Sequence, residues 1–244
     1  MVRAMAKLVL FLTLVGCTWA AAFAQEPGGG VPADDLVPPS DTTALNAWGM
    51  DILISNDGFG MGVFYRREFS PDLFGFVSFS VSESKDGREL ERYDPYTQVS
   101  FVPGKLNRFL VLPLMVGVQR RLFREDITDN FRPYLNAGIG PTMVYAAPFT
   151  EITQTPTGLA VRNVEFFKSL GKGRPYYTAS AFIGAGANFG TDRRNLFGLN
   201  FRYYFTYLFG EGLPSLYDER NGEIAARKKD FGGFFITLNM GLVY

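Results

Sequence analysis

The sequence predicts an all-β protein, an eight-stranded antiparallel up-and-down transmembrane β-barrel. Three observations lead to this fold class: long stretches with one apolar face and one small or polar face, connections that alternate between short and long, and aromatic residues near both ends of the strands. The composition agrees, with 24 Phe, 12 Tyr and 27 Gly. Large apolar side chains suit a lipid-facing wall, and small residues suit a narrow barrel interior.

Eight stretches carry the two-residue period that is typical of strands. They are Leu45–Ser55, Phe59–Phe69, Leu73–Glu83, Arg108–Phe123, Phe131–Ala146, Pro175–Gly190, Leu196–Gly210 and Phe231–Tyr244. The alternation is most regular in the seventh, where Phe, Leu and Tyr occupy every odd position from 197 to 209. Gly198, Asn200 and Arg202 lie on its other face, which we expect to point inward.

The last stretch, Phe231–Tyr244, is strongly apolar on one face and ends on an aromatic residue. In a soluble protein such a strand would be an exposed edge. In a closed barrel within a bilayer it pairs with the first strand and faces lipid. We therefore expect it to close the barrel, and we expect the barrel-assembly machinery to contact the protein through this segment.

The order of the connections predicts the orientation. After the first hairpin at Asn56-Asp57-Gly58, the connections run short, long, short, long, short, long. Alternate connections of an up-and-down barrel lie at the same end, so the three long loops share one rim and the short turns share the other. We expect the bacterial outer membrane, with the long loops extracellular and both termini periplasmic.

Aromatic residues near the strand ends predict two interfacial belts. We place Trp48, Phe69, Tyr134, Phe189, Phe197 and Tyr244 near the short-turn end. Phe59, Tyr145, Tyr177, Tyr207 and Phe209 fall near the long-loop end. Outer-membrane lipid and lipopolysaccharide are the expected surroundings of this wall.

The first part of the chain, Met1–Ala24, has the pattern of a secretory signal peptide. Arg3 and Lys7 precede an apolar run, and Ala22-Phe23-Ala24 forms a small-residue cleavage site. Leu14-Val15-Gly16-Cys17 also resembles a lipoprotein box, so lipidation of Cys17 is an alternative to cleavage before Gln25. Cleavage would remove the one cysteine of the chain.

We expect three parts: residues 1–24 as signal peptide, 25–44 as a disordered Pro/Gly-rich periplasmic linker, and 45–244 as the barrel. The whole chain has 24 basic and 24 acidic side chains. Removing the signal peptide with its two basic residues leaves a slightly acidic protein, which offers no argument for nucleic-acid binding.

From Leu45 onward, the chain resembles the small eight-stranded outer-membrane β-barrels related to the OmpA transmembrane domain, OmpX and OmpW. The resemblance rests on the strand pattern, on the stretch Phe131-Arg132-Pro133-Tyr134-Leu135-Asn136-Ala137-Gly138-Ile139-Gly140 and on the terminal aromatic residue. It implies a membrane barrel found in diderm bacteria, and it identifies no subfamily.

Enzyme chemistry is not expected, because the chain has no histidine. The known outer-membrane barrel enzymes resemble hydrolases or transferases that use a histidine base. We also find no metal-ligand cluster and no phosphate-binding loop, so no cofactor is predicted. Gly138-x-Gly140 and Gly184-x-Gly186 lie within strands, where glycine relieves crowding inside a narrow barrel.

The inward faces carry the charged candidates for a functional site. A predicted lumen polar network comprises Asp51, Arg66, Glu68, Gln119, Arg121 and Arg202. In a small barrel such groups form a network that closes the interior. The alternative is a gated polar path for ions.

Pro113 and Pro141 fall inside neighbouring strands, where a proline removes a ladder donor. One interpretation is a pair of local bulges. The other is a weakened strand seam that opens the lumen sideways, with Phe64, Phe76 and Phe182 lining an apolar lumen pocket.

These observations predict a non-enzymatic outer-membrane protein with a structural or surface-binding role, carried by three long extracellular loops with charged and aromatic residues. The extracellular ligand is not predicted. Two alternatives stay open: a narrow porin or lateral conduit for small hydrophobic solutes, and an accessory subunit of a secretion or envelope-assembly complex.

Overall fold

The computed structural model describes residues 46–95, 98–123, 130–155, 158–189, 195–218 and 223–244. The expected signal peptide, Cys17, the expected linker and Leu45 lie outside these residues. No helix among the described residues has both the length and the apolar character needed to cross a membrane.

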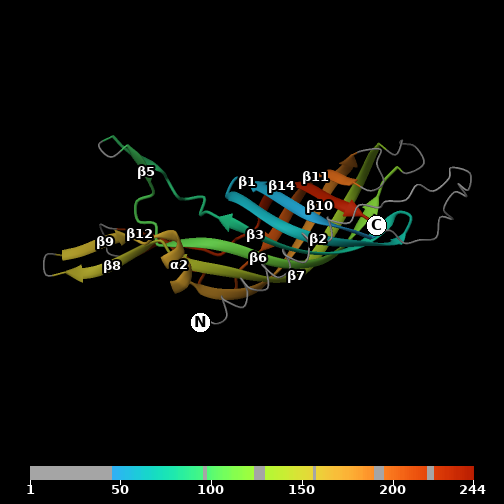
Figure 1. Ribbon diagram of the computed structural model, residues 1–244. Coiled ribbons are helices and arrows are strands. Elements are labelled where there is room, and N and C mark those ends of the chain that lie inside the picture. Colours follow the sequence, from blue (N-terminus) through green and yellow to red (C-terminus); the bar gives the residue numbers. More distant parts are fainter. Residues whose placement is uncertain (1–45, 96–97, 124–129, 156–157, 190–194, 219–222) are drawn as a thin grey trace, which may run out of the picture. The chain divides into compact units, whose positions relative to one another are not determined.

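Eight long strands form a closed antiparallel barrel in which sequence neighbours lie side by side, with the order β1-β14-β11-β10-β7-β6-β3-β2 (Figure 1). The strands are β1 (Asn46–Ser55), β2 (Gly58–Ser70), β3 (Leu73–Ser84), β6 (Asn107–Arg121), β7 (Phe131–Pro148), β10 (Arg174–Phe189), β11 (Asn195–Thr206) and β14 (Gly233–Val243). The predicted eight-stranded up-and-down barrel is therefore confirmed, with small shifts in the strand ends.

The first and last strands close the barrel, as the apolar terminal stretch predicted. β1 pairs with β14 from Ala47↔Val243 to Ser55↔Phe235 without a register shift. Backbone hydrogen bonds in both directions join Asn46 and Tyr244 beyond that ladder. Pairing of these strands removes the free edge that a terminal strand would otherwise present.

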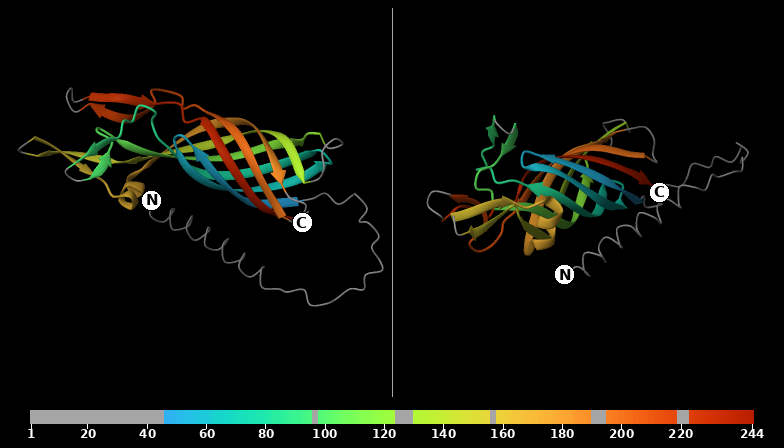
Figure 2. Two further views of the ribbon diagram at one scale, coloured as in Figure 1. Left: turned by 90° about the horizontal axis from the view of Figure 1, so that it is seen from above. Right: turned by 60° about the vertical axis from the view of Figure 1, so that its left-hand side comes forward.

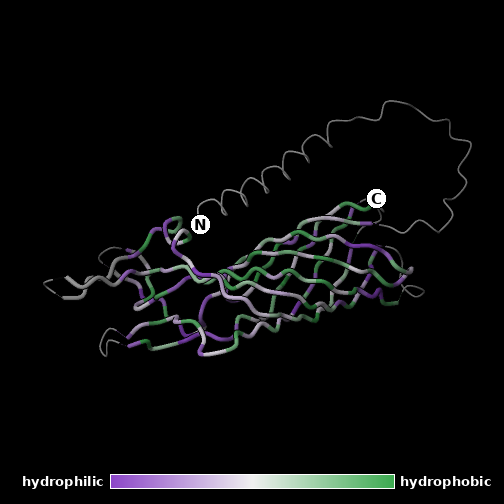
Figure 3. The backbone as a smooth tube through the Cα atoms, turned by 90° about the horizontal axis from the view of Figure 1, so that it is seen from below, coloured by the Kyte–Doolittle hydropathy of each residue, from purple (hydrophilic) through white to green (hydrophobic). Residues whose placement is uncertain are grey.

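The outer wall is apolar and the inner face is small, polar or aromatic. The exposed wall residues include Met50, Met61, Val63, Val77, Leu114, Val116, Val118, Leu135, Ile139, Ile183, Phe201 and Phe205. Figure 3 shows hydrophobic stretches along the barrel strands and hydrophilic stretches toward the ends. This is the reverse of a soluble barrel, whose apolar face points inward.

Glycines on the inner face make room for aromatic rings. A Cβ atom at Gly117 would lie 2.5 Å from the Phe76 ring, and one at Gly138 would lie 2.7 Å from the Phe182 ring. Gly117 and Gly138 face each other across β6 and β7. The glycine-rich pattern of these strands therefore follows from the rings that fill the narrow interior.

The three long connections emerge at one end of the barrel, and Tyr244 lies at the other (Figures 1 and 2). Each long connection contains a two-stranded hairpin that the sequence did not predict. The hairpins are β4 (Arg92–Asp94) with β5 (Val99–Phe101), β8 (Thr150–Thr155) with β9 (Gly158–Asn163), and β12 (Leu213–Asp218) with β13 (Glu223–Lys228). A short helix, α2 (Phe166–Lys172), follows β9.

β11 ends at Thr206, four residues before the predicted end at Gly210. Beyond this point Leu208, the next inward position after Thr206, is buried. Its backbone N–H donates to Lys229 O at 2.9 Å. The alternating pattern continues to Phe209, so the pattern alone could not locate this strand end.

The two prolines interrupt the ladders on the two sides of β6: the gap toward β3 lies at Pro113, and the gap toward β7 lies at Pro141. Pairing with β3 stops at Phe79↔Leu114 and resumes at Ser82↔Val111. Pairing with β7 stops at Pro113↔Thr142 and resumes at Val116↔Ile139. The register is the same across each gap, so the expectation of two bulges is wrong: the prolines remove ladder pairs without inserting an extra residue.

Candidate functional site

The half of the lumen nearest the short turns holds an ion pair at its centre. Arg202 Nη1 donates to Asp51 Oδ2 at 3.2 Å, and Asn239 Nδ2 donates to Asp51 Oδ1 at 2.5 Å. The side chains of Asp51 and Arg202 are only 3% and 5% exposed. Tyr134 extends the network, because its hydroxyl donates to Asn239 Oδ1 at 3.3 Å. Asp51 and Asn239 are paired residues of the neighbouring strands β1 and β14, whereas the contacts of Arg202 and Tyr134 reach across strands that are not neighbours.

Arg66 is also buried in the lumen, where its contacts are aromatic. Its guanidinium carbon lies 4.4 Å from the Phe64 ring centroid and 5.9 Å from that of Tyr134. The assignment of Tyr134 to an interfacial belt was therefore wrong. Tyr134 alternates with the exposed Leu135, and the two-residue period places it inward together with Asn136.

The remaining predicted members of the network spread toward the short-turn rim. Gln119 is buried on the inward face of β6, whereas Glu68 and Arg121 are half-buried. The structure thus brings Asp51 and Arg202 together directly. It adds Tyr134 and Asn239, which the sequence analysis missed although Asn239 lies on the polar face of the last strand.

A layer of apolar and aromatic side chains fills the middle of the lumen. Phe76, Phe182, Tyr204 and Phe235 follow one another with centroid distances of 5.8, 5.0 and 5.3 Å. Leu53 and Met115 complete this buried cluster. Phe76 and Phe182 therefore fill the barrel and do not line an open pocket, and Phe64 lies beneath Arg66.

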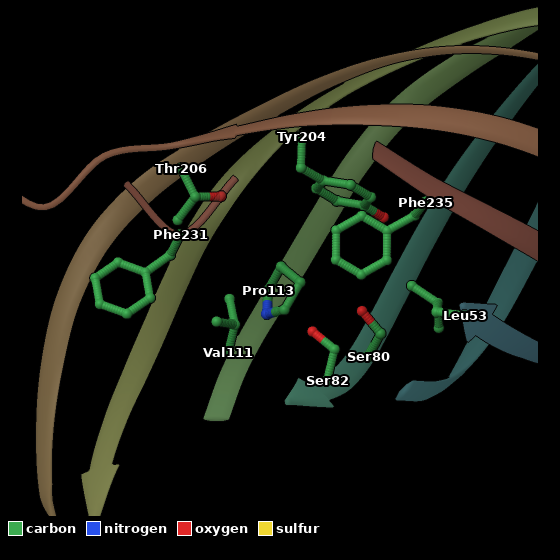
Figure 4. Close-up of a pocket in the computed structure, with 9 residues that line it drawn as sticks. All are labelled: Leu53, Ser80, Ser82, Val111, Pro113, Tyr204, Thr206, Phe231 and Phe235. Carbon is green, nitrogen blue, oxygen red and sulfur yellow. The ribbon is translucent and has the colours of Figure 1, made fainter. Parts of the chain in front are cut away.

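A small cavity lies between this layer and the long-loop end, with a volume of about 10 Å³. That is about enough for one water molecule. Figure 4 shows Ser80, Ser82 and Pro113 facing Tyr204 and Phe235 across it. Beside it, Thr142, Ser180 and Thr206 are joined by hydrogen bonds of 2.6 and 2.7 Å.

A second apolar cluster closes the lumen at the long-loop end. Leu208, Leu213 and Phe231 come from the connection between β11 and β14 and are all buried. They pack against Phe109 and Val111 of β6, with the Phe109 and Phe231 rings 5.3 Å apart. The last connection therefore folds back as a plug over the barrel mouth.

Ion pairs lie above this plug, one within the first long connection and one that joins the last connection to the first hairpin turn. Lys105 Nζ lies 2.6 Å from Glu89 Oε2, and the two side chains are only 9% and 5% exposed. Lys228 Nζ donates to Asp57 Oδ2 at 3.2 Å and also to Lys85 O. Four of the five residues lie on long connections, and Asp57 lies in the first hairpin turn. The rim is thus held together by buried charge pairs.

Asp86 anchors a second link between connections. Arg88 donates to both carboxylate oxygens of Asp86, at 3.0 and 2.8 Å, and to Arg227 O at 2.7 Å. Burial raises the pKa of Asp86, but hydrogen bonds from Arg88 and Ser215 outweigh it and hold the pKa at about 2. The same hydrogen bond raises the pKa of Arg88.

Beyond the plug, the connections present apolar side chains to the outside. Leu90, Tyr93, Phe101, Phe167 and Ile224 are all exposed. No group of three or more His, Cys, Asp or Glu side chains within the described ranges is placed to hold a metal ion. The arrangement offers a surface for contact.

No protein-family model matches the chain, and no curated protein matches it in sequence. Among solved structures, the chain is similar to the attachment invasion locus protein Ail of Yersinia pestis, at 13% identity and a TM-score of 0.39, over 82% of this chain and 97% of that one. It is similar to the N-terminal β-barrel domain of Pseudomonas aeruginosa OprF, at 11% identity and a TM-score of 0.40, over 82% and 97%.

The outer membrane protein OprG of Pseudomonas aeruginosa is similar at 10% identity and a TM-score of 0.41, over 82% of this chain and 95% of that one. At identities and TM-scores this low, the similarity is no evidence that this chain shares a binding site or an activity with these proteins. The assignment of this chain as a closed barrel rests on the strand pairing in its own structure.

Proposed function

We propose that this protein is a non-enzymatic outer-membrane barrel with a closed lumen, and that it binds a partner at the cell surface through its hairpins. The observation that carries the proposal is the plug formed by Leu208, Leu213 and Phe231 together with the charge pairs above it. A protein that closes its lumen and orders its loops gains a rigid platform for binding.

The outer wall supports the membrane location. Its exposed Leu, Ile, Val, Met and Phe side chains would cost free energy in water, at about 25 cal/mol per Å² of apolar surface. A closed barrel leaves no unpaired backbone edge to face lipid. Exposed aromatic residues at both ends of the strands, such as Phe69 and Tyr177, suit the two membrane interfaces.

Site-specific photo-crosslinking in intact cells tests the binding role. A photoreactive amino acid at Tyr93 or Phe101, on the β4–β5 hairpin, is expected to give one common adduct. The same amino acid at Phe123, an exposed residue after β6 at the opposite end of the barrel, is the control. Equal adducts at all three positions, or no adduct at the hairpin, would contradict a hairpin-borne binding site.

A second candidate function is lateral passage of a small hydrophobic solute, and the ladder gaps at Pro113 and Pro141 favour it. Pro113 lines the small cavity and lies in the gap between β6 and β3, and Pro141 lies in the gap between β6 and β7. Restoring the ladder donors with Pro113→Val and Pro141→Val is expected to slow solute uptake into vesicles that contain the barrel. Unchanged uptake would contradict lateral solute passage, and it would not contradict the binding role of the hairpins.

A further inference from the structure

A patch of cationic and aromatic side chains lies on the outer wall at the long-loop end. We call it the rim patch: Arg108, Phe149, Phe166, Phe167 and Lys168. The Arg108 guanidinium carbon lies 4.6 Å from the Phe149 ring centroid and 5.4 Å from that of Phe166. The Phe166 and Phe167 rings meet edge to face at 5.4 Å. One arginine is thus sandwiched between rings from two segments of the chain.

The short helix α2 is held against the outside of the barrel and not over its mouth. Tyr145, on the outward face of β7, donates its hydroxyl to Leu170 O at 2.5 Å. A Cβ atom at Gly173 would lie 2.4 Å from the Tyr145 ring, so any other residue here would require the ring to move. These contacts fix the helix on the wall, and Figure 1 shows it beside the ends of β6 and β7.

The rim patch lies at the level of an interfacial belt. Tyr145 pairs with Leu110, and Arg108 lies two residues further along β6, about 7 Å toward the rim. Tyr177, on the neighbouring strand, is exposed near the same end. Tyrosine at this position marks the boundary between acyl chains and head groups. Arg108 is therefore placed where lipid phosphates would lie, and Lys168 follows two residues after Phe166, whose ring contacts Arg108.

The charges and the exposed rings fit one kind of occupant. Phe167 is 79% exposed and Phe166 is 44% exposed. Among the described residues, no ion pair joins Arg108 to a carboxylate. Lys168 has only an exposed pair with Glu165 at 3.9 Å, which contributes little. An exposed apolar ring beside available cations complements a molecule that carries both phosphate and acyl chains.

We propose that the rim patch binds a phosphate-bearing lipid of the outer leaflet, with the phosphate against Arg108 and Lys168 and an acyl chain against Phe167. The lipid A part of lipopolysaccharide has this chemistry. The inference rests on the proposed outer-membrane location, and it names a lipid contact that is separate from the hairpin binding surface.

Native mass spectrometry of the full-length protein, titrated with diphosphorylated lipid A, tests the inference. Replacing Arg108 and Lys168 together by Gln is expected to weaken the tightest site about ten-fold, as loss of charge-assisted bonds to phosphate requires. Phe167→Ser is expected to weaken it several-fold without an effect on folding, because its ring is exposed. Folding is checked for every variant by heat-modifiable migration on gels.

The matched control removes the same charge at the other rim. Arg67 and Arg120 are exposed and lie on the outward faces of β2 and β6 near the short turns. Replacing both by Gln is expected to leave lipid A binding unchanged. An equal loss in this control would mean general attraction of anions and would overturn the inference.

Two further arms test the source of the phosphate. Dephosphorylated lipid A is expected to bind at least ten-fold more weakly, and millimolar inorganic phosphate is expected not to compete. Equal binding of dephosphorylated lipid, or full competition by phosphate, would overturn the inference. Failure of the protein to insert into vesicles would instead contradict the proposed membrane location, so the two failures are distinguishable.

Discussion

Asp51 lies at the centre of the inner polar network, because its carboxylate joins the other members. It accepts from Arg202 and from Asn239, and the first of these contacts joins two buried charges. A buried pair adds little net stability over an apolar substitute, but removing one partner leaves the other charge unpaired in a poorly polar interior. Replacing one partner alone is therefore expected to lower the free energy of unfolding by more than the ion pair contributes to it.

We predict that Asp51→Ala destabilises the barrel by about 3–5 kcal/mol. Replacing both partners, with Asp51→Leu and Arg202→Met, is expected to recover most of this loss. Urea unfolding from lipid vesicles measures both. Glu211→Gln is the control, because Glu211 is 86% exposed in its pair with Arg227 and is expected to change the stability by less than about 1 kcal/mol. A double variant as unstable as Asp51→Ala would contradict the argument.

Asp86 makes the stability of the rim depend on pH. Its folded-state pKa of about 2 lies below the ordinary value of 3.8, so the ionised group stabilises the rim above pH 3.8. This contribution is lost as the pH falls from 3.8 to about 2. We expect cleavage by pepsin within the 84–107 connection to rise over this range, and Asp86→Asn to show fast cleavage throughout. A variant with the same pH profile as the unaltered protein would refute this.

The element that decides whether the lumen is open is the connection between β11 and β14. Its residues Leu208, Leu213 and Phe231 turn inward over the mouth. Backbone bonds from Leu106 N to Ser215 O, and from Tyr217 N to Gly104 O, attach its hairpin to the first long connection. The plug is thus built from a segment that is polar on average, and its described side chains in the apolar cluster are Leu208, Leu213 and Phe231.

We predict that Lys228→Ala loosens this hairpin while the barrel stays intact. The variant loses the bonds from Lys228 to Asp57 and to Lys85 O, which join β13 to the first hairpin turn and to the end of β3. Trypsin cleavage within 207–232 is expected to become about ten-fold faster, with an unchanged urea midpoint, because opening of a local unit follows its own free energy. Lys229→Ala is the neighbouring control, and equal acceleration there would contradict the prediction.

The whole molecule is a barrel whose interior is filled at three levels. The ion-pair network lies nearest the short turns, the aromatic layer around Phe182 lies in the middle, and the plug lies beneath the long connections. Between the two apolar clusters there is room for about one water molecule. That cavity is too small for a hydrated ion.

We therefore predict no discrete conductance steps when the folded barrel is reconstituted in planar bilayers. Heat-modifiable migration on gels shows that the inserted protein is folded. Phe76→Ala combined with Phe182→Ala removes two rings of the middle layer, and it is expected to stay silent because the plug and the network remain. Regular steps from the unaltered protein would contradict the closed lumen and favour the pore.

Much of this fold could be predicted from the chain, because a strand in a closed barrel repeats every two residues and each face has one environment. That period located all eight wall strands and placed Asp51, Arg66 and Arg202 inward. It did not locate the hairpins or α2, whose segments are short and carry no long alternation. The period is also correct at Tyr134, which is buried, whereas its aromatic residue type alone pointed wrongly to an interfacial belt.

The sequence by itself determined the number of strands, their order, the apolar wall and the end at which the long connections emerge. These features follow from the alternation of apolar and polar residues along each strand and from the lengths of the connections between strands. Only the tertiary structure decided that Asp51 meets Arg202 and Asn239, that Leu208, Leu213 and Phe231 close the mouth, and that α2 lies on the outer wall. Those contacts join residues far apart in the chain, and the geometry of the closed barrel, not any local pattern, sets which of them meet.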